Sequence, residues 1–150
     1  MSQSLSQLYV HLVFSTKDRA PVLHPDITER LHSYLAGIFD EIDSHSLKIG
    51  SAIDHVHSLF SLSKNLPLCK AVEHVKTGSS KWLKTLDPNL RGFHWQAGYG
   101  GFSVSQSEVD RVSQYIANQA QHHRKRSFQD EYRRFLQKYR IIYDERYVWD

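Results

Sequence analysis

The sequence predicts an α+β protein built on an antiparallel sheet. Two observations support this fold class. Short runs rich in β-branched and aromatic residues alternate with longer runs whose apolar residues recur at helical spacing. Their order is strand, helix, strand, strand, helix, strand, which is the ferredoxin-like, or RRM-like, arrangement with both helices on one face of the sheet. A third helix, which carries a tyrosine, is then free to lie over the opposite face.

The first part of the chain supplies three strands and one helix. We expect a strand over Gln7–Thr16, where β-branched and aromatic residues gather. Apolar residues at helical spacing predict an amphipathic helix over Asp26–Asp43. Two further strands follow, at Leu47–Ile53 and His55–Ser63, and the pattern leaves the exact position of the turn between them open.

The second part of the chain supplies one strand and three helices. A second amphipathic helix is expected over Leu66–Leu86, and a glycine-rich aromatic segment ends in a strand at Phe102–Val104. Ser105 and Glu108 have the spacing of a capping box, which predicts the start of a third helix. A last helical segment is expected at Phe128–Gln137.

Length and composition favour one globular domain over residues 1–150, with 40% hydrophobic and 23% charged residues. Cys69 is the only cysteine, so no internal disulfide can form and a reducing compartment is indicated. The N-terminus does not read as a signal peptide, and no apolar run approaches the roughly 18 residues of a membrane span. We expect a soluble, cytoplasmic protein with no membrane partner.

Basic residues gather toward the C-terminus. The formal net charge is +3, but nine of the 19 lysines and arginines lie in the last 40 residues, and residues 124–126 read Arg-Lys-Arg. Such a segment is typical of a surface that binds nucleic acid. The alternative from composition alone is an ordinary solvated basic surface.

The run "IDHVHSLFSL" places two histidines one residue apart on a predicted strand. Because side chains alternate across a strand, His55 and His57 share one face, while Val56, Phe60 and Leu62 face the core. Two imidazoles at this spacing can bind one divalent cation, although a third ligand must come from elsewhere. The alternative is a pair of ordinary histidines on a half-exposed strand.

The third predicted helix carries groups that could complete such a site. Arg111, Tyr115, Gln119 and His122 form one polar stripe at helical spacing. Gln119 offers an oxygen ligand suited to Mg²⁺ or Mn²⁺, and the phenol of Tyr115 can attack a phosphodiester. The alternative is that Tyr115 only packs. We expect His11, on the first strand, to be structural.

These residues resemble a known family. The segments "DHVHSLFSL", "YGGFSVSQS" and "YIANQAQHH" are similar to the single-tyrosine HUH transposases of small bacterial insertion sequences, the IS200-like transposases, which include the REP-associated tyrosine transposases. The histidine motif of the family corresponds to His55-Val56-His57, and the similarity runs over nearly the whole chain. One departure is Ser58, where a large aliphatic residue is more usual.

The resemblance implies a DNA transposase that cleaves and rejoins single-stranded DNA at hairpins. Tyr115 would be the nucleophile, forming a 5′-phosphotyrosine, and His55, His57 and Gln119 would bind catalytic Mg²⁺ or Mn²⁺. The resemblance also implies a homodimer, often one in which each tyrosine helix serves the partner's histidine pair. A dimer is needed because one nucleophile per chain holds only one strand end. The candidate DNA-binding residues are Arg124, Lys125, Arg126, Lys81, Lys84 and Arg111.

Two alternatives to strand transfer remain open at this point. The first is an HUH nickase that cleaves DNA without joining two ends, although such enzymes usually belong to longer chains. The second is a non-catalytic, RRM-like nucleic-acid-binding module. The combination of His55, His57, Tyr115 and Gln119 favours an enzyme over this module.

Overall fold

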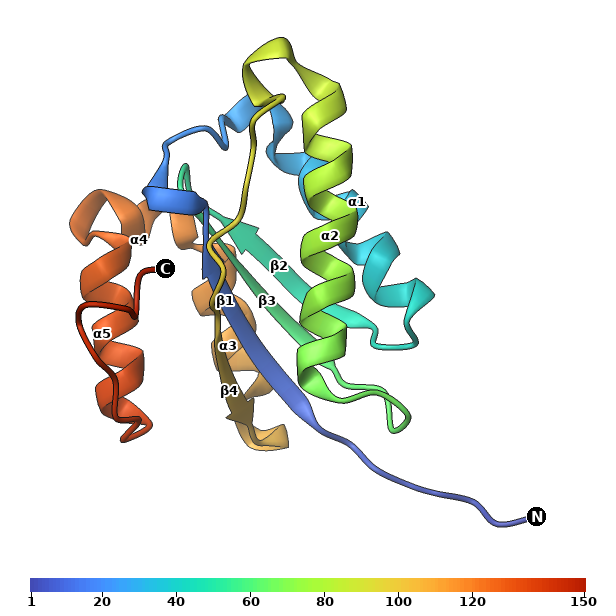
Figure 1. Ribbon diagram of the computed structural model, residues 1–150. Helices are drawn as coiled ribbons and strands as arrows, with labels where there is room; N and C mark the ends of the chain where they lie inside the picture. The colour runs from blue at the N-terminus through green and yellow to red at the C-terminus, as the bar shows by residue number, and fades with distance from the viewer.

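A four-stranded antiparallel sheet forms the centre of the computed structural model, which describes residues 1–150 (Figure 1). The sheet order is β2-β3-β1-β4, which is the strand order expected of a ferredoxin-like domain, so the predicted fold class is confirmed. Its strands are β1 (Tyr9–Ser15), β2 (Ser46–Ser51), β3 (His55–Ser61) and β4 (Gly100–Val104).

Helices cover both faces of this sheet (Figure 1). One side is covered by α1 (Pro25–Glu41) and α2 (Leu68–Leu86), as predicted. The other side is covered by α3 (Val109–Ala117), α4 (Gln119–Lys125) and α5 (Phe128–Lys138). None of the helices is long and apolar enough to cross a membrane.

The predicted third helix differs from the structure at its start and in its middle. A short 3-10 helix, Gln106–Glu108, precedes α3, and the hydroxyl of Ser105 lies 3.2 Å from that of Ser107 instead of capping the helix. The helix then breaks at Asn118, whose φ of −101° and ψ of 22° depart from helical values. Because of this break, the predicted helix is two shorter helices, α3 and α4. Two further 3-10 helices are Lys17–Arg19 and Pro88–Leu90.

Strand β3 separates two different environments. Val56 and Phe60 are fully buried in an apolar cluster that α1 and α2 complete, and the rings of Phe60 and Phe39 lie 4.6 Å apart. The alternate residues face the other helices: His55 faces α4 and α5, and His57 faces α3 and α5. The period-two alternation predicted for this strand is therefore confirmed.

The tyrosine-bearing helix α3 packs against the sheet at very short range. A Cβ added at Gly50 in β2 would lie 2.1 Å from the carbonyl oxygen of Ile116. Only glycine leaves room for this approach, and Ile116 itself is fully buried beside Leu59. Gly50 thus fixes how close α3 comes to the histidine-bearing strand.

Helix α5 is held over β1 and β4 by a separate aromatic cluster. Phe128, Tyr132 and Leu136 are buried against Val13 and Phe102. The C-terminal segment then folds back over α5, where the guanidinium of Arg133 pairs with Glu145 at 2.6 Å and lies 5.0 Å from the ring centroid of Trp149. This packing fixes the placement of α5 against the sheet.

Candidate active site

The two histidines of β3 lie in the interior of the protein. His55 is 1% exposed and His57 is fully buried, so the alternative of ordinary surface histidines is wrong. Their Nε2 atoms both face one carboxylate oxygen, Oε1 of Glu131, at 3.3 Å from His55 and 2.8 Å from His57. The pair therefore points at a common place beneath α5.

Each imidazole is also held from its other side. Nδ1 of His55 lies 2.7 Å from Oδ1 of Asp54, and Nδ1 of His57 lies 2.7 Å from Nε2 of His11. The pairing of β1 with β3 places His11 opposite Leu59, diagonal to His57 on the same face. Such contacts orient a histidine so that its free nitrogen can bind a metal. His11 thus positions His57, in line with the structural role expected for it.

Two oxygens complete a set of four inward-facing atoms that could bind a metal. The amide oxygen of Gln119 lies 3.0 Å from Nε2 of His55, and Oε1 of Glu131 lies 3.3 Å from the same nitrogen. The other amide atom of Gln119, Nε2, is buried without a partner. Mg²⁺ prefers octahedral geometry with bonds of roughly 2.1 Å, which separates neighbouring ligand atoms by about 3.0 Å. The observed separations of 2.8, 3.0 and 3.3 Å match this spacing, so the residues fit a divalent cation.

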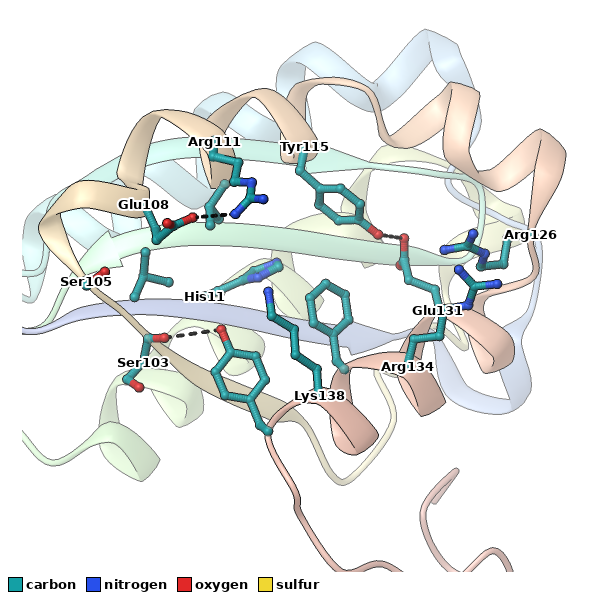
Figure 2. A pocket seen from close by; sticks show the side chains of 14 residues that line it. His11, Ser103, Ser105, Glu108, Arg111, Tyr115, Arg126, Glu131, Arg134 and Lys138 are labelled. Carbon is teal, nitrogen blue, oxygen red and sulfur yellow. Dashed lines mark hydrogen bonds and ion pairs between the residues drawn. The ribbon is translucent and has the colours of Figure 1, made fainter.

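Tyr115 meets the same carboxylate from α3. Its hydroxyl donates a hydrogen bond to Oε2 of Glu131, the oxygen that does not face His57 (Figure 2). The Tyr115 ring stacks on His122, with centroids 4.5 Å apart and an angle of 25° between the planes. The tyrosine and the histidine pair therefore converge within one chain.

Burial and charge set the protonation of this cluster. Burial alone would lower the pKa of His55, but its hydrogen bonds to Asp54 and Glu131 outweigh burial and raise that pKa to about 9. Burial lowers the pKa of His57. Burial would raise the pKa of Glu131, but the two histidines hold it well below its usual value. Burial, and then the charge of Glu131, raise the pKa of the Tyr115 phenol.

A cavity of about 610 Å³ opens beside Tyr115, between α3 and α5 (Figure 2). Two of the predicted DNA-binding residues, Arg111 and Arg126, line it. Arg111 is paired with Glu108 at 3.0 Å. His11 and Glu131 also line this cavity, so it connects the candidate metal site to solvent.

The other predicted DNA-binding residues lie elsewhere. Arg124 and Lys125 are exposed on α4, next to Arg126. Lys81 and Lys84 lie on α2, which covers the opposite face of the sheet (Figure 1). The structure does not bring these two lysines near Tyr115.

Sequence reasoning missed the carboxylate at the centre of the site. Glu131 is 4% exposed and lies on α5 at helical spacing with Phe128, Tyr132 and Phe135. A charged residue on an otherwise apolar helical stripe was the available signal. Asp54 was visible beside His55, but its contact with that ring depends on the tertiary structure.

Comparison with known proteins agrees with this fold. Residues 4–119 match the sequence family described as IS200-like transposases. A structure assigned to a transposase of Deinococcus radiodurans R1 is 25% identical, with a TM-score of 0.60, and the alignment covers 80% of this chain and 98% of that one. A REP-associated tyrosine transposase bound to a REP hairpin shares the fold at 11% identity and a TM-score of 0.55, covering 77% and 70% of the two chains. The comparison with curated proteins found no match.

The fold and the comparisons together define a transposase that cleaves DNA. The chain belongs to the IS200-like transposase family, as its motifs predicted. The matched segment ends at residue 119, so α5 and its Glu131 lie beyond it.

Proposed function

We propose that this protein cleaves and rejoins single-stranded DNA through a covalent bond to Tyr115. One observation supports this more than any other. The Tyr115 hydroxyl contacts Glu131, whose second oxygen lies 2.8 Å from Nε2 of His57. Contacts to one carboxylate thus place a nucleophile beside a set of cation ligands, and a metal-assisted phosphodiester transfer needs both near the same phosphate.

The proposed step exchanges one ester bond to phosphorus for another. The phenol of Tyr115 gives up its proton and its oxygen forms a bond to phosphorus, while the bond from phosphorus to the 3′ oxygen breaks, so the proton lost by the phenol balances the one that the 3′ oxygen gains. The products are a 5′-phosphotyrosine and a 3′ hydroxyl that takes up a proton. Attack by the 3′ hydroxyl of another strand on the phosphotyrosine reverses these changes and joins two ends. His122 holds the phenol ring by stacking, and Glu131 holds the hydroxyl.

We propose that His55, His57, Gln119 and Glu131 hold Mg²⁺ or Mn²⁺. When bound, such a cation polarises the scissile phosphate and stabilises the charge that develops on it. Glu131 is an addition to the three ligands predicted from the sequence. Asp54 and His11 orient the two imidazoles from behind.

We propose hairpin-forming DNA as the substrate and a homodimer as the active assembly. The REP-associated tyrosine transposase of similar fold is bound to a REP hairpin. Each chain contributes a single nucleophile and so holds one strand end, which is why two chains are needed to exchange two ends. Within each chain Tyr115 lies beside its own histidine pair, so each subunit would carry a complete site.

The test of this function is covalent capture of DNA. The wild-type protein, incubated with Mn²⁺ and a single-stranded oligonucleotide that contains a hairpin and its flanks, should form an adduct that survives denaturing electrophoresis. Tyr115→Phe should form none, whereas Tyr147→Phe, which alters an exposed tyrosine, should react like the wild type. Adduct formation by Tyr115→Phe would remove Tyr115 from the mechanism.

A further inference from the structure

The cavity beside Tyr115 carries positive charge that the protein leaves unneutralised. Arg126, Arg134 and Lys138 line it, and none of the three lies within ion-pair distance of a carboxylate. Arg111 lines it as well, but Glu108 neutralises it. Unpaired cations around a concave surface favour an anionic ligand.

The charge follows from the spacing of residues along α5. Glu131, Arg134 and Lys138 are three and four residues apart, so they share one face of the helix. Glu131 turns into the metal site, while Arg134 and Lys138 extend from the same face into the cavity (Figure 2). The first of these cationic side chains, Arg134, therefore lies about one helical turn from Glu131, the carboxylate that accepts a hydrogen bond from the Tyr115 hydroxyl.

Aromatic rings form the apolar part of the same cavity. Phe135 and Tyr139 line it, and both stack on Phe102 of β4, with centroids 5.3 and 4.7 Å away. Each ring is only partly buried. Rings held in this way, next to cations, are the two components with which proteins bind single-stranded nucleic acid.

The basic surface continues beyond the cavity. Arg126 and Arg134 also line a second cavity of about 410 Å³ together with Lys125, whereas Arg133, which lines it too, is paired with Asp130 at 3.2 Å. That second cavity has no apolar lining residue. The two cavities share the pair Arg126 and Arg134, so an extended anion could pass from one to the other over the start of α5.

We infer that α5 binds the DNA strand next to the scissile phosphate, with Arg134, Lys138 and Arg126 on its phosphates and a base against Phe135. The inference rests on the proposed function, because it places the strand relative to Tyr115. A volume of about 610 Å³ lies within the usual range for a small-molecule site, which is enough for one nucleotide. Arg134, Lys138 and Phe135 lie beyond the segment matched to the family, whereas Arg111 and Tyr115, which line the same cavity, lie within it.

The experiment measures binding of an unstructured single-stranded oligonucleotide as a function of salt, by fluorescence anisotropy, in a Tyr115→Phe background that prevents covalent capture. The test variant is R134Q/K138Q. The matched control is R30Q/R91Q, which removes two exposed charges on α1 and after α2. The variant R134K/K138R, which retains both charges, tests whether charge alone accounts for the effect.

We expect R134Q/K138Q to bind roughly tenfold more weakly at low salt, and its plot of log affinity against log salt to lose about 1.4 of its slope, or 0.7 for each lost phosphate contact. The control should match the parent protein, and R134K/K138R should keep most of the slope. An unchanged slope in R134Q/K138Q would overturn the inference. So would a loss seen only with a duplex hairpin.

The outcome is separable from that of the proposed function. If binding shows the predicted loss but Tyr115→Phe still forms adduct, the strand site stands and the nucleophile is wrong. If the slope is unchanged but Tyr115→Phe forms no adduct, the nucleophile stands and the strand site is wrong.

Discussion

The two faces of the sheet use the same strands for different purposes. Beneath α1 and α2 lies one continuous apolar cluster of 18 buried residues, whereas the face under α3 and α5 carries two small clusters of 5 and 4 residues. Between those small clusters lie the buried polar groups of the site. Strand β3 supplies Phe60 to the first face and His57 to the second. The large apolar cluster on one face thus stabilises the fold, while the other face has an apolar core that buried polar groups interrupt.

The largest expected effect is on the first face. Phe60→Ala removes a fully buried ring that packs on Phe39. It should lower the free energy of unfolding by about 3–5 kcal/mol, because the protein loses the transfer free energy of the buried ring and is left with a cavity in its place. Chemical denaturation measures this directly. A loss below about 1 kcal/mol would show that this face is not the main source of stability.

The next effect tests how closely α3 must approach the sheet. Gly50→Ala places a methyl group against the backbone of Ile116, so α3 must move outward. We expect a loss of about 1–3 kcal/mol in stability and a slower formation of the covalent adduct. Gly37→Ala is the matched control, because nothing lies within 4 Å of its added Cβ and it should stabilise α1. Equal behaviour of the two variants would contradict this close packing.

Glu131→Gln tests whether the polar face is a metal site. The amide keeps the shape of the side chain but removes the charge that faces both imidazoles. Mn²⁺ affinity, measured by calorimetry, should fall by about 10–100-fold, and the rise in melting temperature caused by Mn²⁺ should shrink. Glu73→Gln, an exposed position paired with Lys70, should bind Mn²⁺ like the wild type. Unaltered affinity in Glu131→Gln would exclude this carboxylate as a ligand.

The last effect concerns a cation on the first face. The Nζ of Lys76 on α2 donates to the carbonyl oxygen of Gln96 at 2.7 Å, and burial lowers its pKa to about 8. In the unfolded chain its pKa is about 10.4, so between these values the unfolded state binds more protons and stability rises with pH. From pH 8 to 10 the wild type should gain stability relative to Lys76→Met. A relative loss over that interval would contradict the assignment.

Local periodicity predicted the parts of the site that lie on one element. His55 and His57 share a face because strands have a period of two, and Tyr115 and Gln119 were predicted together from helical spacing. Asn118 interrupts that helix, yet the amide of Gln119 still reaches His55 at 3.0 Å. The fold class followed from the order of the elements.

Contacts between distant elements were not predictable in this way. Glu131 meets His57 across 74 residues, and His11 meets it across 46. Both contacts depend on how β1 and α5 are placed relative to β3, and no local pattern specifies that placement. The same limit explains why Lys81 was expected near the DNA, although α2 lies on the other face of the sheet.

The most direct test is to locate a bound cation by anomalous diffraction from crystals soaked in Mn²⁺. We predict one strong peak within roughly 2.1–2.2 Å of Nε2 of both His55 and His57, with an oxygen of Glu131 in contact and the Tyr115 hydroxyl beside it. A peak on the other side of His55, between Asp54 and His123, would contradict this account. So would a cation site remote from Tyr115.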